Sequence, residues 1–358
     1  MSRSIQGHFI GRVCTVTRHT RVLAVVLLLS IAPGCNDEYP ESLEYQFQPY
    51  HTLSASNERE TLDVDPALAQ EIAGALKDYF GTPRNPTVKL SEDLKNNPEL
   101  KLDDHRLSRG SHYYRRYCLY CHGINGDGNG PTGRFLLPRP RDFRLGIFKF
   151  RTNQQGTTPT RMDLKHTLVN GIPGSSMPSF GILSDDDLEY LVSYVIHLSL
   201  RGIVERQYVL AKRAGEEADI GELLEAAART WIGNSATVVN APEPPGGWYK
   251  FYQEGVLSDW KRGRELYTTK GACVECHGRD GRASAIELPT NVNRRDAWGE
   301  LIVPRDLTHG VYRGGSRPVD IFYRIKVGIP GTGMPGAALS DEEIWHVVGY
   351  VMSMPLRR

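Results

Sequence analysis

The chain contains two copies of one short cysteine motif, and this motif constrains the fold more than any other feature of the sequence. The copies share the spacing C-x-x-C-H and consist of Cys118, Cys121 and His122, and of Cys273, Cys276 and His277. On a helix, this spacing places two thiols one turn apart, with an imidazole directly beside the second. Two such thiols can form thioethers to the vinyl groups of one haem, while the imidazole reaches the iron from the same side. We therefore expect two covalently bound haems c.

Other chemistry is known for paired cysteines. Single C-x-x-C pairs elsewhere bind zinc or act as dithiol redox centres. Here both pairs are followed directly by histidine, both recur within a repeat, and both lie in a chain with an export signal. These features favour covalent haem. The remaining two cysteines, Cys14 and Cys35, fall in or at the edge of the N-terminal segment, so no structural disulfide is expected.

Residues 1–34 are expected to be an export signal. Several arginines precede the apolar run 22–32, which is too short to span a bilayer comfortably as a helix. Gly34 and Cys35 follow, and this segment resembles the lipobox of bacterial lipoproteins, in which a small residue precedes an acylated cysteine. Ala32 departs from the leucine usual in that box, and the alternative is ordinary cleavage with Cys35 incidental. We expect a lipid at Cys35, and hence a protein on the periplasmic side of a membrane.

An internal repeat organises the rest of the chain, because the two motifs lie 155 positions apart, from Cys118 to Cys273. Each copy has a helix with a Gly and a Tyr, the cysteine motif, a Pro-Arg-Asp segment, a Gly-Ile-Pro-Gly loop ending in Met-Pro, and a final helix. The matching positions are Gly110 with Gly263, Tyr114 with Tyr267, Pro140 with Pro304, Met177 with Met334, and Tyr194 with Tyr350. No stretch between them alternates convincingly with period two, so both copies should be mainly helical.

Both final helices begin with a start signal. Ser184 is followed three residues later by Asp187, and Ser340 is followed by Glu343. In such a capping box the serine accepts from the backbone of the third helical residue, and the acid there reaches back. We expect the last helix of each copy to begin at these serines.

Two further helices are expected outside the repeat. Asp65 as N-cap, Pro66 at the first helical position and Gly81 as a stop predict one of them. Residues 36 to about 63 are polar and lack periodicity, so they are expected to be a tether. A charged stretch from Val204 to Trp231 predicts the second helix, within the connection between the copies. Its candidate buried positions are Leu210, Leu223 and Leu224.

A haem iron held by His122 or His277 needs a sixth ligand, and a thioether there favours the ferrous state. Met177 and Met334 stand in matching loops, each followed by proline, 55 and 57 residues after their histidines. A lone methionine is ordinarily core filler, but the matching loops favour axial ligation. The others, Met162, Met352 and Met354, are expected to be packing residues.

These features together resemble the class I c-type cytochromes, over about residues 107–200 and 257–358. The resemblance implies a mainly α fold, with two tandem cytochrome c-like domains joined by a partly helical linker. The expected plan is a signal peptide at 1–34, a lipid-anchored tether and extension with one helix at 35–106, a first domain at 107–200, a linker at 201–256, and a second domain at 257–358.

The resemblance also implies roles for particular residues. In this family a glycine on the first helix lets it cross the last helix at a tyrosine, as expected for Gly110 with Tyr194 and for Gly263 with Tyr350. A proline carbonyl holds the other nitrogen of the axial histidine. Its candidates are Pro140 and Pro304, with Pro138 and Pro131 as alternatives in the first domain.

Several charged residues have two interpretations. Arg141 and Arg305, with Asp142 and Asp306, either pair with haem propionates or are surface arginines and turn aspartates. A basic run in the first domain is either a solvated face or a docking patch for an acidic redox partner. It comprises Arg134, Arg139, Arg141, Arg144, Lys149 and Arg151. The histidines without counterparts in the repeat are expected to be surface or packing residues. They are His112, His166, His197, His309 and His346.

The formal net charge is +1, from 43 basic and 42 acidic residues, so nothing indicates a nucleic-acid partner. The expected function is electron transfer outside the cytoplasm through two His/Met-ligated haems. The donor and acceptor are redox proteins, and the chain is either a free carrier or a subunit of a respiratory membrane complex. The alternative is a dihaem oxidoreductase, of peroxidase or thiosulfate-oxidising type, with one labile haem ligand. Since both copies have the same methionine loop, electron transfer is favoured over an enzyme.

Overall fold

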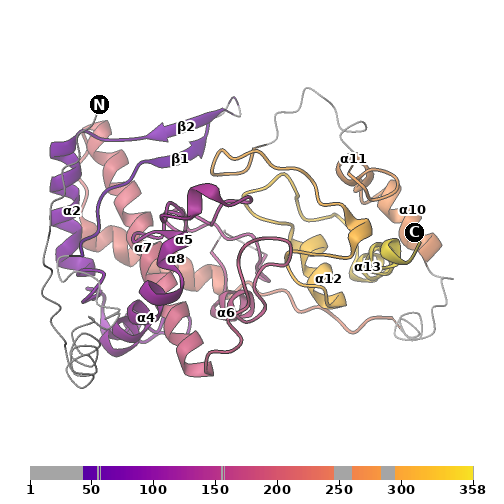
Figure 1. Ribbon diagram of the computed structural model, residues 1–358, viewed down its shortest axis with the longest axis horizontal. Coiled ribbons are helices and arrows are strands. Elements are labelled where there is room, and N and C mark those ends of the chain that lie inside the picture. The colour runs from indigo at the N-terminus through magenta and orange to yellow at the C-terminus, as the bar shows by residue number, and fades with distance from the viewer. Residues whose placement is uncertain are drawn as a thin grey trace, which may run out of the picture. The chain divides into compact units, whose positions relative to one another are not determined.

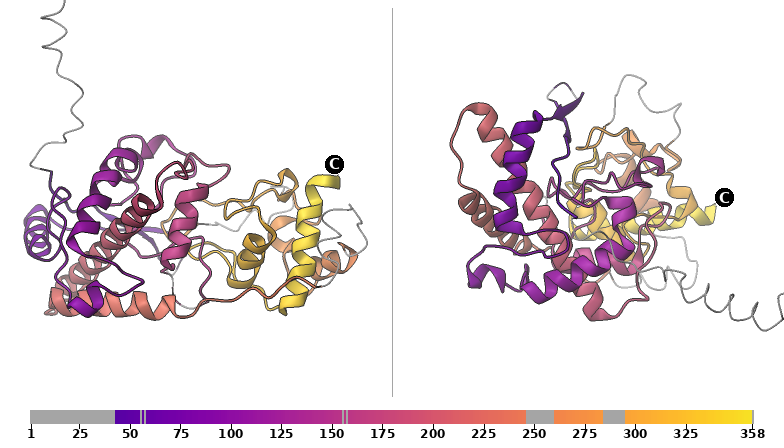
Figure 2. Two further views of the ribbon diagram at one scale, coloured as in Figure 1. Left: turned by 90° about the horizontal axis from the view of Figure 1, so that it is seen from below. Right: turned by 60° about the vertical axis from the view of Figure 1, so that its left-hand side comes forward.

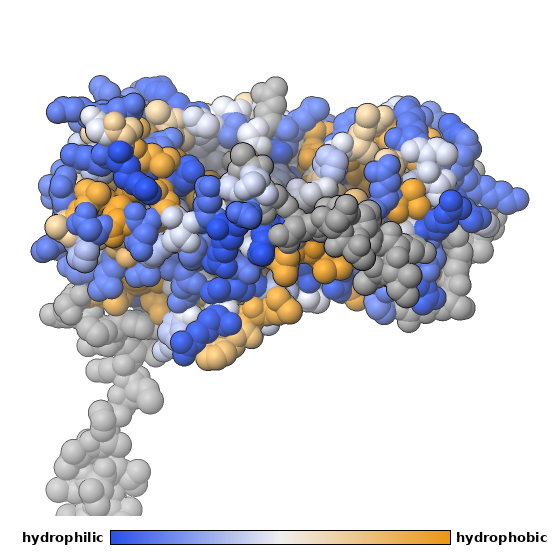
Figure 3. Space-filling model, turned by 90° about the horizontal axis from the view of Figure 1, so that it is seen from above, coloured by the Kyte–Doolittle hydropathy of each residue, from blue (hydrophilic) through white to orange (hydrophobic). Residues whose placement is uncertain are grey.

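The computed structural model describes residues 43–54, 56, 58–154, 156, 158–245, 260–283 and 295–357, and it is mainly helical (Figure 1). The expected export signal and Cys35 lie outside the described residues. Within the described ranges, no helix is both long enough and apolar enough to cross a membrane. On the face drawn in Figure 3, apolar residues form separate patches among hydrophilic ones.

The first repeat folds around two crossing helices, α4 (Asp104–Tyr117) and α7 (Asp185–Ala214). They approach closely because Gly110 has no side chain. A Cβ there would overlap the carbonyl oxygen of Tyr190 and lie 2.8 Å from the Cβ of Tyr194. The rings of Tyr114 and Tyr194 pack beside this crossing, with centroids 5.2 Å apart. The predicted glycine and tyrosine crossing is therefore confirmed.

The second repeat is built in the same way from α10 (Trp260–Thr268) and α13 (Asp341–Ser353). A Cβ on Gly263 would overlap the carbonyl oxygen of His346 and lie 2.8 Å from the Cβ of Tyr350. The rings of Tyr267 and Tyr350 are again 5.2 Å apart. The two copies thus share one packing solution, in which a glycine sets the distance between the first and last helices.

Shorter helices complete both domains. The first domain contains α5 (Leu119–His122), the 3-10 turn η1 (Gly133–Phe135) and α6 (Arg161–Asn170). The second contains α11 (Val274–His277), η3 (Leu307–His309), α12 (Pro318–Val327) and η4 (Met354–Arg357). The first domain was expected at residues 107–200 and the second at 257–358. The first domain extends beyond its expected range at both ends, because α4 begins at Asp104 and α7 continues to Ala214.

The last helices begin at the predicted serines, but only one capping box is complete. Ser340 and Glu343 satisfy each other's backbone N–H groups at the start of α13. Ser184 accepts from the backbone N–H of Asp187, and hydrogen bonding to the Tyr113 hydroxyl and to Ser184 lowers the pKa of Asp187. The serine half of the first box is therefore formed as predicted.

The expected tether is wrong from residue 43 onward. An antiparallel hairpin, β1 (Tyr50–Leu53) with β2 (Arg59–Leu62), pairs Tyr50 with Leu62. Tyr45 is buried, and its hydroxyl lies 2.9 Å from that of Tyr194 on α7. Single tyrosines, rather than a periodic apolar pattern, fasten this segment to the first domain. For this reason its sequence reads as unstructured.

The predicted helix after Asp65 is confirmed as α2 (Pro66–Phe80), with the Asp65 side chain accepting from two backbone N–H groups and Gly81 at its end. Its buried residues are Ile72, Leu76 and Phe80. α2 packs on α7 and α8, and a further short helix, α3 (Glu92–Lys95), also contacts α8. The N-terminal extension is thus part of the folded body around the first domain.

The linker was predicted to hold one helix from Val204 to Trp231, and this is wrong. α7 continues to Ala214 and ends at Gly215, which adopts the left-handed conformation with φ of 73°. α8 (Ile220–Ser235) follows and packs beside α7 (Figure 2). Of the three predicted leucines, Leu224 is fully buried, Leu223 is half-buried and Leu210 is exposed. The break falls where a glycine permits positive φ.

Candidate haem sites and the seam between them

Each cysteine motif ends a one-turn helix. α5 stops at Gly123 with φ of 74°, and α11 stops at Gly278 with φ of 73°. The four motif cysteines are free thiols. Burial raises the pKa of Cys118 to about 12 and that of Cys273 to about 11, so both thiols are protonated at neutral pH.

Both motif histidines are oriented by a backbone carbonyl. Nδ1 of His122 lies 3.2 Å from the carbonyl oxygen of Arg141, and Nδ1 of His277 lies 3.0 Å from that of Arg305. An imidazole that donates from Nδ1 keeps its Nε2 lone pair for a metal. Burial lowers the pKa of His122 to about 4, which keeps the ring neutral.

The partner carbonyl differs from the expected one. Pro140 and Pro304 were its candidates, with Pro138 and Pro131 as alternatives, but in both domains the next residue after Pro140 or Pro304 supplies the oxygen. The proline fixes its own φ and restricts the conformation before it, so it shapes the turn that presents the following carbonyl.

Two contacts at these sites were missed in the sequence. The Tyr114 hydroxyl donates to the carbonyl of Gly123 at 2.8 Å, and Tyr267 donates to Gly278 at the same distance. Each tyrosine therefore joins the helix crossing to the residue after the motif histidine. In the first domain, Phe143 also stacks on the His122 ring with centroids 4.6 Å apart. The repeated Tyr and Gly positions were the available signal.

The two methionine loops have the same backbone structure. The N–H of Ile172 donates to the carbonyl of Met177 at 3.1 Å, and Ile329 donates to Met334 at 2.9 Å. A hydroxyl two residues before each methionine, on Ser175 or on its counterpart in the second loop, accepts from the methionine N–H. Both loops are closed by their own hydrogen bonds, and both methionine side chains are half-buried.

The other methionines differ from one another. Met354 is buried and Met352 is partly buried against the core of the second domain, as expected for packing residues. Met162 is 71% exposed at the start of α6, so its assignment as a packing residue is wrong.

The residues present fit a c-type haem in each domain. Each motif offers two cysteine thiols and an imidazole oriented by a backbone carbonyl, and each domain adds a thioether in a loop closed by its own hydrogen bonds. Across the described ranges, no three His, Cys, Asp or Glu side chains are grouped so that they could hold a metal ion.

The comparisons with known proteins find a cytochrome family at each of the two motifs. Residues 105–195 match the family described as cytochrome C oxidase, cbb3-type, subunit III, and residues 260–355 match the cytochrome c family. A solved chain from the reducing HAO-like protein complex of Kuenenia stuttgartiensis is 30% identical, with a TM-score of 0.53, over 69% of this chain and 95% of that one. No curated protein matches. This chain is a dihaem c-type cytochrome. It carries two covalently bound haems c, and its chemistry is haem-based electron transfer.

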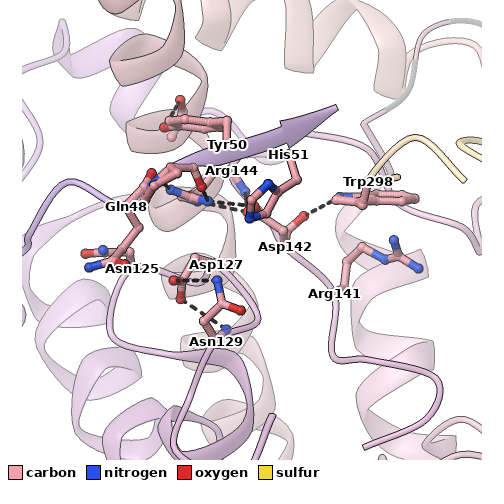
Figure 4. Close-up of polar contacts among 12 residues, drawn as sticks. Gln48, Tyr50, His51, Asn125, Asp127, Asn129, Arg141, Asp142, Arg144 and Trp298 are labelled. Atoms are coloured by element: carbon pink, nitrogen blue, oxygen red, sulfur yellow. Dashed lines mark hydrogen bonds and ion pairs between the residues drawn. The ribbon is translucent and has the colours of Figure 1, made fainter. Parts of the chain in front are cut away.

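The basic run of this cytochrome is only partly a solvated face, because Arg134 is exposed whereas other members are buried. Arg144 is fully buried and Arg151 is 6% exposed. The Arg144 guanidinium pairs with Asp142 at 2.8 Å and donates to the carbonyls of Gln48 and Pro49 at 2.7 and 3.0 Å (Figure 4). Residues 45–50, here called the N-terminal strap, are thereby fixed over the loop that carries the Arg141 carbonyl.

Two members of the run meet an acid of the second domain. Asp296 pairs with Lys149 at 3.1 Å and with Arg141 at 3.8 Å, and its side chain is 5% exposed. Burial lowers the pKa of Lys149 to about 8, although Asp296 opposes this shift. An acid for part of this run is therefore supplied by the same chain.

The remaining charged residues and histidines that the sequence singled out have different roles in the two repeats. Arg141 is neither a surface arginine nor free to move, because its guanidinium lies 3.3 Å from the ring centroid of Trp298. Asp306 is a turn residue that accepts from the N–H of Thr308 at 2.8 Å. His197 is a packing residue, as expected, buried with its ring 5.6 Å from that of Tyr194.

Proposed function

We propose that this cytochrome transfers electrons between redox protein partners through two His/Met-ligated haems, as a free carrier or as a subunit of a respiratory complex. Cys118 and Cys121 would attach the first haem, with His122 and Met177 as its iron ligands. The second site has the matching set, which comprises Cys273, Cys276, His277 and Met334. A bound haem supplies a one-electron iron couple, and a methionine ligand raises its potential.

The observation that carries this proposal is the equivalence of the two sites. Both place the histidine against a backbone carbonyl, both anchor the following glycine to a tyrosine, and both present methionine from a closed loop. An electron-transfer site needs two strong ligands held in place, so that little rearrangement accompanies a change of charge. A substrate-binding iron would instead need an open face.

The surface supports transient partners. Exposed apolar side chains lie within and beside the first motif, including Tyr120 at 53% exposure and Phe135 at 74%. Electron-transfer encounters use small interfaces, so patches of this kind suit them. The Kuenenia stuttgartiensis neighbour belongs to a redox complex, which favours a subunit or a dedicated partner over a wholly free carrier.

We further propose that the protein is exported and acts at the periplasmic side of a membrane, anchored by a lipid on Cys35. The apolar run and the small residue before this cysteine support the anchor. Mass spectrometry of the mature N-terminus tests it. An unmodified Cys35, or a mature chain that starts elsewhere, would make the protein unanchored after export.

One observation favours a second candidate, a dihaem oxidoreductase with one labile ligand: the solved neighbour is a chain of a reducing HAO-like protein complex. Carbon monoxide separates the two candidates. A cytochrome with two His/Met haems should be low-spin at both irons and inert to carbon monoxide. Binding at one haem of the unmodified protein, or rapid turnover of peroxide or thiosulfate, would establish the enzyme instead.

Replacement of the methionines tests the ligands directly. Met177→Ala and Met334→Ala should each open one iron to carbon monoxide, lower the potential of that haem, and leave its thioethers intact. Met162→Ala is the matched control, because this methionine is exposed and belongs to the first domain. It should change neither property. If Met177→Ala binds no more carbon monoxide than the unmodified protein does, Met177 is not an iron ligand.

A further inference from the structure

Trp298 stands between the two haem sites. It is 5% exposed, and the tight turn that carries it is held by Asp296, whose carboxylate accepts from the N–H groups of Trp298 and Glu300 at 3.1 Å each. Such a turn leaves the indole little freedom of position. The side chain therefore has a fixed place, rather than filling a loose gap.

On one side, the indole is bonded to the loop that orients the first axial histidine. Its Nε1 donates to the carbonyl of Asp142 at 3.2 Å, and the Arg141 guanidinium lies on its face (Figure 4). Asp142 directly follows Arg141, whose own carbonyl lies 3.2 Å from Nδ1 of His122. One residue of backbone thus separates the indole hydrogen bond from the histidine hydrogen bond.

On the other side, the indole rests on the second methionine loop. A Cβ on Gly331 would lie 2.7 Å from both Cη2 and Cζ3 of Trp298, so the ring sits directly against this glycine. The residue before Trp298 adds a hydrogen bond, since the N–H of Ala297 donates to the Gly331 carbonyl at 2.8 Å. Gly331 lies three residues before Met334, within the same closed loop.

We propose that Trp298 is the bridge for electron transfer between the two haems, an inference that rests on the proposed function. The route runs from His122 through the Arg141 carbonyl and the Asp142 backbone, across the indole, and along the Gly331 loop to Met334. Each link is a covalent bond, a hydrogen bond or a van der Waals contact, so no water-filled gap interrupts it. One electron leaves a ferrous iron and reduces the ferric iron of the other site. No proton moves, and the indole N–H stays bonded to Asp142.

A second contact shows that the arrangement is reciprocal. Gly174 of the first methionine loop occupies the position that Gly331 has in the second, and a Cβ there would lie 2.5 Å from Nη2 of Arg305. The Arg305 carbonyl holds His277. The first methionine loop therefore touches the segment that orients His277, whereas the second reaches the segment that orients His122 through Trp298. Only the contact at Gly331 involves an aromatic ring, since the contact at Gly174 is made by the Arg305 guanidinium. We therefore expect electron transfer to pass through Trp298 rather than through Arg305.

The test uses the holoprotein and measures electron transfer between its own haems, without any partner. Pulse radiolysis delivers less than one electron per molecule, and the redistribution between the haem absorption bands gives the rate. Trp298→Phe keeps an aromatic ring but loses the N–H, whereas Trp298→Leu loses both. We expect the rate to fall in the order wild type, Trp298→Phe, Trp298→Leu. Each variant should still contain two haems with wild-type reduction potentials, and pulsed EPR should give the wild-type distance between them.

Trp345→Phe is the matched control. Trp345, on α13, is 2% exposed, and its indole donates to the carbonyl of Pro242 at the same 3.2 Å and packs on the ring of Phe322, and both of these residues lie outside the two methionine loops. The Trp345→Phe variant should transfer electrons at the wild-type rate. Wild-type rates in both Trp298 variants would overturn the proposed bridge. A slower rate accompanied by a longer inter-haem distance would also overturn it, because Trp298 would then only hold the domains together. If Trp298→Leu does not accumulate with two haems, Trp298→Phe decides alone. Because no donor or acceptor enters the assay, its result is independent of the proposed partners.

Discussion

Glu189 on α7 fastens the start of α6, and its removal gives a prediction with a defined pH dependence. Its carboxylate accepts from Arg161 at 2.8 Å and pairs with Lys165 at 3.2 Å. The Arg161 side chain is 6% exposed and also donates to the Leu100 carbonyl. Since α6 leads directly into the loop of Met177, loss of this carboxylate should loosen the first haem site. We consider the variant Glu189→Gln.

The magnitude follows from the pKa of Glu189. Burial raises this pKa, but the hydrogen bond and charge of Arg161 outweigh burial and lower it to about 2 from its ordinary value of 4.5. A shift of this size corresponds to about 3 kcal/mol of stability. The side chain is 24% exposed, so solvent screening reduces the expected contribution to about 1–2 kcal/mol. Because the folded-state pKa is depressed, this contribution is complete above pH 4.5 and is lost as the pH falls to about 2.

Urea unfolding of the holoprotein, followed by far-ultraviolet circular dichroism, measures the effect. At pH 7, Glu189→Gln should lower the free energy of unfolding by about 1–2 kcal/mol, and the difference from wild type should shrink as the pH falls below 4.5. Glu225→Gln is the control, because Glu225 forms an exposed pair with Arg229 on α8. It should cost about 0.5 kcal/mol or less. A Glu189→Gln deficit that stays constant down to pH 2 would refute the electrostatic explanation.

Three further predictions concern the repeated parts of the fold. Tyr114→Phe leaves the buried Gly123 carbonyl without its hydroxyl partner, and it should lower the urea stability of the first domain by about 1–3 kcal/mol; an unchanged stability would argue against that bond. Gly263→Ala places a methyl group on the backbone of α13 and should destabilise the second domain by about 1–3 kcal/mol, with the first domain unaffected in hydrogen exchange. Replacing Cys118 and Cys121 together by alanine should halve the haem content measured as pyridine haemochrome. Loss of all haem would show that the two domains fold as one unit.

The features that sequence predicted correctly are those that a short stretch of chain determines. The helix after Asp65 needed only a cap, a proline and a terminal glycine. The crossings at Gly110 and Gly263 were predictable because the glycine and its tyrosine recur in the same order in both copies. Repetition supplied the evidence that one copy alone could not have given.

The features that sequence did not predict depend on partners far along the chain. The basic run suggested a solvated face, since nothing near it in sequence marks Asp296 and Trp298 as its neighbours. The strap suggested a tether because it is fastened by isolated side chains such as Tyr45, whose burial follows no period. The carbonyl that holds His122 was displaced by one residue from its expected position, because backbone direction at a turn is set by conformation rather than by residue type.

The N-terminal strap has a consequence for the order of folding. Its bonds join residues that are 96 positions apart at Gln48 and Arg144, 149 apart at Tyr45 and Tyr194, and 155 apart at Tyr50 and Glu205. Contacts between distant residues carry a larger loop-closure entropy and slow folding. The helix crossing of the second domain joins Gly263 to Tyr350 over 87 positions, and that of the first joins Gly110 to Tyr194 over 84, so the two crossings close over similar lengths of chain and the strap adds longer closures to the first domain. The second haem domain, although synthesised last, therefore has fewer long closures to complete, and the first domain should be the later of the two to acquire all its native contacts, because the strap must still close over it.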